Sequence, residues 1–376
     1  MSRIKIVHVI TGLTIGGAEM MLLNLLSRME DSRFETSVIS LTAGGRICTA
    51  IEALGINVMS LEMQQGRPSI KAAALLLKYL RSQKPDLIQG WMYHGNLAAQ
   101  LCGTLLRIPV CWCIQNSFCS FASEKPLTRL VIKIMARLSG SAAKIVFVSH
   151  VARSQHARLG FQTRSSCVIP NGVDPSIFEP DFSARLSVRE ELGVSSAARL
   201  IGLIGRYHPQ KDHETFLRAA EFLASTRNDV HFVLAGTNVD NDNPAFKRFL
   251  SSPSLLGRLH LMGERSDMAR LMAGLDIATS SSSYGEALSL AVAESMACAV
   301  PCVVTDVGDS GSLVGDTGII VPPRDARMLS QGWEQLLAIG DSALRSMGEA
   351  ARRRIEEHYS LNGISHMYCE MYNSLI

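Results

Sequence analysis

The sequence predicts an α/β protein made of two doubly wound, Rossmann-like domains, and three features lead to that prediction. The chain has 376 residues, more than one ordinary domain needs and enough for two. Apolar runs alternate with helical patterns along its length, as in repeated β-α-β units. The pattern restarts after the segment Pro170–Pro175, which is dense in turn-forming residues and where we place the domain boundary.

The first domain, residues 1–170, contains strands that are apolar along most of their length. Such strands are buried on both faces, which indicates a parallel sheet covered by helices. The expected strands are Ile4–Ile10, Glu35–Leu41, Asn57–Ser60, Leu87–Trp91, Val110–Gln115, Lys144–Val148 and Cys167–Pro170. The expected helices are Ala18–Met29, Ser69–Ser82, Gly95–Leu106, Glu124–Leu138 and His150–Leu159.

The second domain, residues 171–359, repeats this alternation. Its expected strands are Arg199–Gly205, Val230–Ala235, Leu259–Met262, Asp276–Thr279, Pro301–Thr305 and Gly318–Val321. Its expected helices are Asp212–Ser225, Ser266–Ala273, Ser289–Cys298 and further helices from Asp325 onward. Sheets of this kind bind ligands at the carboxyl ends of their strands, so the loops that follow strands are the candidate sites.

The overall composition is that of a globular protein, with 47% hydrophobic and 19% charged residues. No stretch of about 20 uninterrupted apolar residues predicts a membrane-spanning helix. The apolar start contains Lys5 and His8 and lacks a cleavage site, which argues against a signal peptide. Nine scattered cysteines are typical of reduced thiols, and together these features predict a cytoplasmic protein.

The charges are unevenly divided between the two halves of the chain. Residues 1–170 hold 19 Lys and Arg against 8 Asp and Glu, whereas residues 171–376 hold 18 against 26. A basic first half indicates an anionic partner. On the expected helix Glu124–Leu138 four cations, each four residues apart, form one stripe, namely Lys125, Arg129, Lys133 and Arg137.

This basic stripe has an ordinary interpretation, a solvated helix face opposite the apolar face formed by Leu127, Leu130, Val131, Ile134 and Leu138. Like charges four residues apart repel each other, however, which favours a functional role. We expect this domain to contact anionic lipid at the inner face of the plasma membrane, and no nucleic acid, and to accept a lipid-linked diphosphate sugar.

The first loop, Thr11–Glu19, is rich in glycine and opens a helix. Gly16 and Gly17 let the backbone approach a ligand, and the helix start offers free N–H groups to an anion. The spacing is not that of a dinucleotide fingerprint, and the second expected strand ends at Ile39–Thr42 without an acid for a ribose. No Lys followed by Ser or Thr completes a phosphate-binding P-loop either.

The segment from Glu286 to Glu294 gives the strongest signal. Eight residues of helix would separate the two carboxylates by about 12 Å, which exceeds the roughly 5–9.5 Å of a glycoside hydrolase pair. The spacing suits two carboxylates that hold opposite ends of one polar ligand, with the N–H groups near Ser289 and Leu290 offered to a diphosphate. The alternative is an amphipathic helix with solvated glutamates, but apolar residues surround Glu294 on almost every side, so it needs partners.

A second basic element follows the first strand of the second domain. Arg206 and Lys211 stand five residues apart in a loop that opens a helix. Two cations so placed can bind one diphosphate and neutralise the leaving group. Surface Arg and Lys are common, so this element alone does not distinguish a site from a solvated loop.

Four motifs, taken in chain order, resemble those of a family 4 retaining glycosyltransferase of the GT-B fold. They are the Gly16-Gly17 loop, the Asn171-Gly172-Val173-Asp174 linker, the Gly205-Arg206…Lys211 loop and the E-x7-E block from Glu286 to Glu294. The resemblance covers nearly the whole chain. It implies that the two domains face each other across a cleft and that the last helix, 360–376, completes the first domain.

The resemblance also implies residue roles. Arg206 and Lys211 would hold the donor diphosphate, Glu286 the transferred sugar and Glu294 the ribose. Gly16 and Gly17 would approach from the other domain, and His94 fits the place of the histidine that the family sets near the donor sugar. The helix start at Ser289 and Leu290 and the two cations would take the place of a metal, and no cofactor is implied because the nucleotide sugar is a substrate.

Three positions depart from the family pattern. Ala299 stands where the family often has Gly, Leu288 and Ser289 replace an aromatic residue and Gly, and Asp212 replaces the usual Gly after Lys211. A separate sequence, Asp240-Asn241-Asp242, matches the D-x-D of metal-dependent transferases, but its polar, turn-forming surroundings favour a turn. These departures leave the identity of the donor open.

The function expected from the sequence is therefore retaining, metal-independent hexosyl transfer from a UDP- or GDP-sugar to a glycan or lipid-linked acceptor, in bacterial surface polysaccharide or lipopolysaccharide synthesis. No side chain is an obvious nucleophile, so we expect front-face transfer in which the protein supplies positioning and charge stabilisation. Two alternatives remain: a nucleotide-sugar epimerase on the same fold, and a non-catalytic nucleotide-binding partner in a polysaccharide-assembly complex.

Overall fold

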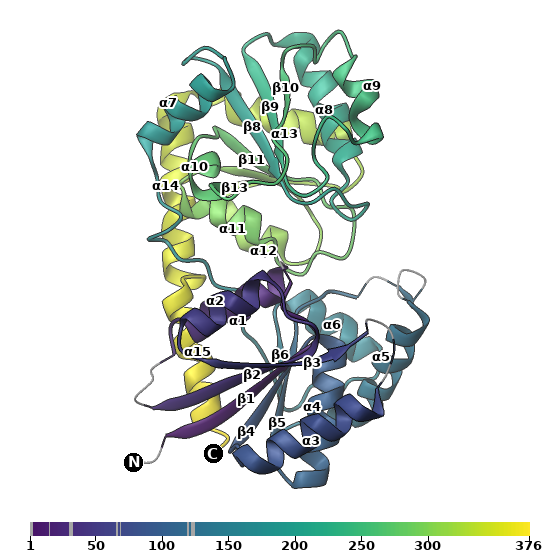
Figure 1. Ribbon diagram of the computed structural model, residues 1–376. Coiled ribbons are helices and arrows are strands. Elements are labelled where there is room, and N and C mark those ends of the chain that lie inside the picture. Colours follow the sequence, from purple (N-terminus) through teal and green to yellow (C-terminus); the bar gives the residue numbers. More distant parts are fainter. Residues whose placement is uncertain are drawn as a thin grey trace. The chain divides into compact units, whose positions relative to one another are not determined.

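The computed structural model describes residues 3–14, 16–29, 33–64, 67, 69–118, 120–121 and 125–376. The chain divides into two compact units, which are drawn in Figure 1. Unit 1 comprises Met1–Gly172 together with Leu361–Ile376, and unit 2 comprises Val173–Ser360. The sequence placed the boundary after residue 170; the chain leaves unit 1 after Gly172 and returns at Leu361.

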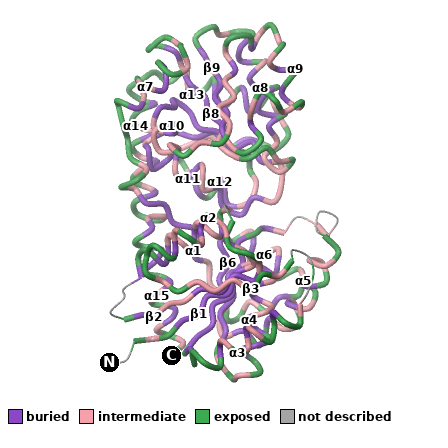
Figure 2. The backbone as a smooth tube through the Cα atoms, viewed as in Figure 1, coloured by how far each residue is buried: buried purple, intermediate pink, exposed green. Residues whose placement is uncertain are grey.

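Unit 1 is built on a seven-stranded parallel sheet in the order β3-β2-β1-β4-β5-β6-β7. The strands are β1 (Ile4–Ile10), β2 (Phe34–Thr42), β3 (Asn57–Met63), β4 (Leu87–Trp91), β5 (Val110–Ile114), β6 (Lys144–Phe147) and β7 (Ser166–Val168). All seven expected strands are present, and their apolar character follows from helices that cover both faces. Figure 2 shows buried backbone along the strands of this sheet.

The helices of unit 1 form a layer on each face of this sheet. One core joins the sheet to α1 (Gly17–Leu26), α2 (Arg46–Ala53) and the C-terminal α15 (Leu361–Asn373). The other joins it to α3 (Ile70–Gln83), α4 (Met92–Leu106), α5 (Pro126–Leu138) and α6 (His150–Arg158). The sequence did not predict α2, a short helix after Gly44 and Gly45 that buries only Ile47 and Ile51.

The C-terminal helix α15 packs on unit 1 through a buried, mostly aromatic contact. Tyr368 stacks on Trp91 with ring centroids 6.2 Å apart, and its hydroxyl lies 3.4 Å from the Cys113 sulfur. The Trp91 indole N–H donates to Nδ1 of His8 at 3.1 Å. Burial lowers the pKa of His8 to about 3, so this ring is neutral and accepts that bond at ordinary pH.

Unit 2 repeats the architecture with a six-stranded parallel sheet in the order β10-β9-β8-β11-β12-β13. The strands are β8 (Arg199–Ile204), β9 (Val230–Ala235), β10 (Leu259–Leu261), β11 (Ile277–Ser280), β12 (Cys302–Thr305) and β13 (Gly318–Val321). The helices are α7 (Phe182–Glu191), α8 (His213–Thr226), α9 (Lys247–Leu250), α10 (Met268–Ala273), α11 (Leu290–Ala297), α12 (Ser310–Val314), α13 (Ala326–Ala338) and α14 (Asp341–His358).

A buried carboxylate ties α7, which the sequence did not predict, to the sheet of unit 2. Asp276, directly before β11, accepts from Arg185 and Arg189 of α7 at 2.5 Å each and from Arg199 of β8 at 3.3 Å. The backbone N–H of Leu200 adds a fourth bond at 2.7 Å. Four donors compensate for the burial of this charge, which unpaired would cost several kcal/mol.

Candidate functional site

The middle of the unit 2 sheet is where the order of the strands reverses, between the adjacent strands β8 and β11. Open α/β sheets bind ligands outside the carboxyl ends of the strands at this position. The loop after β8 carries Arg206 and Lys211, and the loop after β11 carries Glu286. The structure therefore brings three of the predicted site residues to one edge of the sheet.

Lys211 and Glu286 form a partly enclosed ion pair at this edge. The ammonium of Lys211 donates to Oε2 of Glu286 at 2.5 Å, and the Ser282 hydroxyl donates to the same oxygen at 2.9 Å. Burial by itself would raise the pKa of Glu286, but Lys211, Ser282 and the charge of Arg206 outweigh it and hold that pKa below its usual value. Glu286 is therefore a carboxylate at neutral pH, with Oε1 left to accept from a ligand hydroxyl.

The serines that follow β11 join the two loops together. The Ser281 hydroxyl donates to the backbone oxygens of Lys211 at 2.8 Å and Asp212 at 3.1 Å. The Ser283 N–H donates to the backbone oxygen of Gln210 at 2.8 Å. This role was not predicted, although a run of serines directly after a buried strand was a usable signal, because Ser hydroxyls form hydrogen bonds with nearby backbone groups.

A third loop, after β12, packs against the backbone of Glu286. Gly308 has φ +64° and lies so close that a Cβ there would stand 2.0 Å from the backbone oxygen of Glu286. Only glycine satisfies both the backbone conformation and the space. The Asp309 N–H donates to the backbone oxygen of Ala287 at 3.0 Å, so the Glu286 loop is held along its length.

Asp212 explains one departure from the family pattern. It has φ +49°, a conformation that glycine adopts freely and that Asp and Asn tolerate better than most residues. Its side chain also accepts from the Thr215 N–H at 3.2 Å and so caps the start of α8. The substitution thus keeps the turn that positions Lys211 and adds a helix cap.

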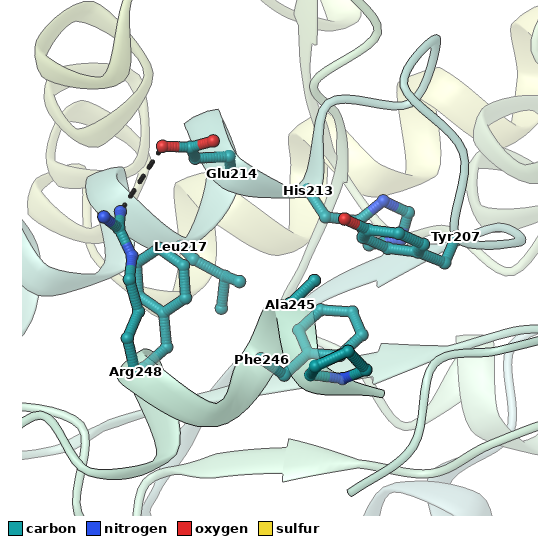
Figure 3. Close-up of a pocket in the computed structure, with 9 residues that line it drawn as sticks. Tyr207, His213, Glu214, Leu217, Ala245, Phe246 and Arg248 are labelled. Atoms are coloured by element: carbon teal, nitrogen blue, oxygen red, sulfur yellow. Dashed lines mark hydrogen bonds and ion pairs between the residues drawn. The ribbon is translucent and has the colours of Figure 1, made fainter. Parts of the chain in front are cut away.

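Aromatic contacts anchor the segment between Arg206 and Lys211. The ring centroid of Tyr207 lies 5.4 Å from that of His213 and 5.3 Å from that of Phe246. Figure 3 shows the pocket that these three residues help to line. Arg206 itself is exposed. Burial and then the charges of Arg206 and Lys211 lower the pKa of the nearby His208, so the loop carries its positive charge on Arg206 and Lys211.

Helix α11 presents an uncapped N-terminus and, in its second turn, the carboxyl group of Glu294. No side chain caps the helix at Ser289, so the N–H groups of its first turn, from Leu290 onward, remain for a ligand. Glu294, in the second turn, is half-buried, and within the described parts of the chain its carboxyl has no hydrogen bond or ion pair. Burial raises the pKa of Glu294 to about 8.

The bounds of α11 lie within one residue of the expected helix Ser289–Cys298, with Glu286 in the loop before it. The helix begins at Leu290, so only the second half of the stretch from Glu286 to Glu294 is helical. The separation of about 12 Å calculated for eight helical residues therefore does not describe this pair. Ser289 precedes the helix because its backbone is extended, with φ −80° and ψ 106°.

In unit 1 the predicted glycines and histidine follow β1 and β4, the neighbouring strands at which that sheet reverses its order. Helix α1 begins at Gly17, and a Cβ on Gly16 would lie 2.5 Å from a carboxylate oxygen of Glu19. His94 lies in the first turn of α4, which begins at Met92 and not, as expected, at Gly95. Burial lowers the pKa of His94, so the imidazole is neutral at pH 7.

The basic stripe of α5 lies mainly on the accessible side of the helix. Lys125, Lys133 and Arg137 are exposed and Arg129 is half-buried. The expected first residue, Glu124, lies outside the described residues, and the helix begins at Pro126. Leu130, which the sequence placed on the covered face, is 53% exposed, so an apolar side chain accompanies the cations on the surface.

The D-x-D segment forms a turn. Oδ1 of Asp240 accepts from the backbone N–H of Asp242 at 3.0 Å and of Asn243 at 3.1 Å. This is the bonding pattern of an Asx turn, in which an Asp side chain stabilises the loop that contains it. None of the helices in the described part of the chain combines the length and the apolar character needed to cross a bilayer.

Comparison with known proteins assigns both units. Residues 15–177 match the model described as Glycosyltransferase Family 4, and residues 198–338 match the model described as Glycosyl transferases group 1. In structure, Anabaena Alr3699/HepE in complex with UDP-glucose superposes with a TM-score of 0.83 at 20% identity, over 99% of this chain and 100% of that one.

Two relatives are named for transfer reactions. The UDP-Gal:alpha-D-GlcNAc-diphosphoundecaprenol alpha-1,3-galactosyltransferase of Escherichia coli is 21% identical over 98% of both chains. The N,N'-diacetylbacillosaminyl-diphospho-undecaprenol alpha-1,3-N-acetylgalactosaminyltransferase of Campylobacter jejuni is 26% identical over 86% of this chain and 87% of its own. Fold and matches together define a glycosyltransferase with the GT-B fold. The chain belongs to glycosyltransferase family 4, as the sequence motifs predicted.

Proposed function

We propose that this glycosyltransferase transfers a sugar, with retention of anomeric configuration, from a UDP- or GDP-sugar bound by unit 2 to a glycan or lipid-linked acceptor in bacterial surface polysaccharide synthesis. The observation that carries the proposal is the Lys211–Glu286 pair at the carboxyl ends of β8 and β11, 2.5 Å apart and joined by Ser282. A carboxylate and a cation held together at this position suit a ligand that has both hydroxyls and phosphates.

Each group of the site has a role in binding such a donor. Arg206 and Lys211 neutralise the diphosphate, and the free N–H groups at the start of α11 add further donors for its oxygens. Glu286 accepts hydrogen bonds from hydroxyls of the transferred sugar. Glu294, neutral below pH 8 without ligand, provides its carboxyl group to the ribose hydroxyls.

The same residues suggest how transfer proceeds. Glu286 is engaged by Lys211 and Ser282, so it positions the sugar rather than attacking it. Charge develops on the diphosphate as the glycosidic bond breaks, and the fixed cations stabilise it without the reorganisation that water would need. A diphosphate oxygen takes the proton of the incoming hydroxyl on the same face of the sugar, which retains the configuration. The reaction in this form requires no metal ion.

The acceptor side of the proposal rests on unit 1. The two relatives described above are named for acceptors carried on diphosphoundecaprenol. Unit 1 has the basic sequence and the exposed cations of α5, and we propose that it meets the anionic diphosphate and the membrane surface at the cytoplasmic face. His94 is the candidate polar contact to the transferred sugar from this unit.

The test begins with the donor. Thermal denaturation is measured with UDP-, GDP- and ADP-sugars, because a ligand at about 100 times its Kd stabilises a protein by about 2.7 kcal/mol. The stabilising donor is then incubated with a lipid-linked diphosphate sugar, and the linkage of the product is determined by NMR. An α-linked product from an α-linked donor supports the proposal, and an inverted product contradicts it.

The same experiment separates the two alternatives. A new nucleotide sugar formed without acceptor would identify an epimerase. Saturable binding of the nucleotide sugar without turnover on any acceptor would identify a non-catalytic partner. The matched control is Arg345→Gln, an exposed cation of unit 2 on α14, which should leave both stabilisation by donor and transfer unchanged.

A further inference from the structure

Unit 1 contains an apolar pocket of about 220 Å³ lined by α3, α4 and α5, in which α4 contacts both of the other helices. These helices can be followed in Figure 1. Most of the lining side chains are aliphatic, among them Leu76, Leu97, Ala98, Leu101 and Val131. Leu41 of β2 and Met63 of β3 close it at the ends of their strands, so the pocket opens near the carboxyl edge of the sheet.

The few polar groups of the pocket are His94, Ser69 and Arg67. Ser69 already accepts from the Ala72 N–H at 3.2 Å as the cap of α3, so its hydroxyl oxygen is used within the protein. His94 is the candidate sugar contact discussed above, which places the pocket next to the proposed site of transfer. A sugar inside the pocket would leave most of its hydroxyls without partners, which is costly, whereas a hydrocarbon would not.

The surface around the pocket has the mixed character of a lipid-binding surface. Leu101 of the lining is 53% exposed, and the neighbouring helix surfaces expose Leu105 at 71%, Leu130 at 53% and Ile70 at 91%. The exposed cations of α5, beginning with Lys125, lie on the helix that contributes Leu127 and Val131 to the pocket. Apolar side chains beside cations match a ligand that joins a hydrocarbon to a diphosphate.

We propose that this pocket binds the isoprenoid segment next to the diphosphate of the acceptor, so that unit 1 recognises the lipid as well as the sugar. The inference rests on the proposed function, because it takes the acceptor to be lipid-linked. The hydrocarbon occupies the space between α3, α4 and α5, and the cations of α5 meet the diphosphate. An acceptor held in this way has its sugar at the edge of the sheet where His94 lies.

The test measures binding without any transfer. Isothermal titration calorimetry compares farnesyl diphosphate with inorganic diphosphate on the full-length protein, and the isoprenoid ligand should bind at least tenfold more tightly. Ala98→Phe fills the pocket, and Ala73→Phe fills its exposed rim on α3; each should weaken farnesyl diphosphate at least tenfold. Ala74→Phe, exposed on the same helix but outside the pocket, is the matched control and should bind as the wild type does.

Several outcomes would overturn the inference. Equal affinity for the two diphosphates would show that the hydrocarbon is not recognised, and an equal loss in Ala73→Phe and Ala74→Phe would show a nonspecific effect. Displacement of farnesyl diphosphate by phospholipid vesicles would assign the pocket to a bilayer acyl chain. Binding that depends on the hydrocarbon of farnesyl diphosphate, without transfer to any acceptor, would refute the proposed function but would still support the assignment of the pocket. Circular dichroism excludes unfolded variants.

Discussion

The two units share one architecture but use their charged residues differently. In unit 2 many arginines are paired inside the fold, as around Asp276, and Arg265 and Arg270 both bind Glu191 and Asp267. In unit 1 the exposed cations of α5, namely Lys125, Lys133 and Arg137, have no carboxylate partner among the described residues. Paired cations stabilise a fold, whereas unpaired ones remain available to a ligand.

The same contrast extends to the candidate sites. Unit 2 holds Glu286 and Lys211 in a bonded pair, and groups fixed in this way need little reorganisation when they act on a ligand. Unit 1 offers an apolar pocket with a neutral His94 at its edge and a basic helix beside it. Under the proposed function, one Rossmann-like scaffold serves a polar donor in one unit and an amphipathic acceptor in the other.

The largest expected effect concerns the basic stripe of α5. Replacement of Lys125, Arg129, Lys133 and Arg137 by Gln should weaken binding to anionic vesicles by about 1 kcal/mol per charge, up to roughly a thousandfold in all. Vesicle co-sedimentation at low and high salt measures it. The control makes the same charge change in unit 2, at Lys247, Arg324, Arg345 and Arg353, which are exposed. An equal loss of vesicle binding in both variants would show that only net charge matters. It would contradict the proposed difference between the cations of the two units.

The next effect tests the preformed pair of unit 2. Lys211→Met should lower kcat/KM by about a hundred- to a thousandfold, because it removes a fixed charge from the leaving group. Glu286→Gln should impair transfer while the nucleoside diphosphate, which lacks the sugar, still binds. Steady-state kinetics and calorimetry measure the two properties. Ser283→Ala removes only a 3.3 Å bond to the Pro209 oxygen and should stay within a fewfold of wild type. Loss of nucleoside diphosphate binding in Glu286→Gln would contradict its assignment to the sugar.

A smaller effect follows from the raised pKa of Glu294. Its pKa is about 8 in the folded protein against 4.5 for an unperturbed Glu side chain, so the folded state retains a proton that the unfolded chain releases. Folding stability should therefore fall as pH rises from 4.5 to 8. Glu294→Gln removes this dependence and should gain about 2 kcal/mol over wild type at pH 8.5 but nothing near pH 4, after allowance for solvent screening. Denaturant unfolding without nucleotide, across that pH range, measures the difference in unfolding free energy between the variant and the wild type. A difference that does not change with pH would contradict the assignment.

The smallest effect concerns Ala299, which stands where the family often has Gly. It has φ +57° directly after α11, a conformation that disfavours a side chain. Ala299→Gly should therefore stabilise the protein by about 0.5–1 kcal/mol, visible as a higher Tm. Ala291→Gly, inside the same helix, is the control and should destabilise by a similar amount. A lower Tm for Ala299→Gly would show that this turn is not strained.

Strand positions were the part of the fold most accessible to prediction. All seven strands of unit 1 and all six of unit 2 lie at the expected places, because long apolar runs bounded by turn residues leave few alternatives. The helices α2, α7, α9 and α12 were not predicted. Each buries only a few side chains, and α7 depends on Arg185 and Arg189 reaching Asp276, a contact about 90 residues distant along the chain.

The sequence by itself determined the fold class, the family and the residue types at the candidate donor site, since Arg206, Lys211, Glu286 and Glu294 stand in motifs with fixed spacing. Only the tertiary structure decided which of them meet. It pairs Lys211 with Glu286, assigns Ser281 and Ser282 to the same loops and leaves Glu294 without a partner in the described residues. It also forms the apolar pocket of unit 1 from strands and helices far apart in sequence. The reason is physical: spacing constrains neighbours along one element, whereas burial, pKa and cavities depend on atoms that packing brings from others.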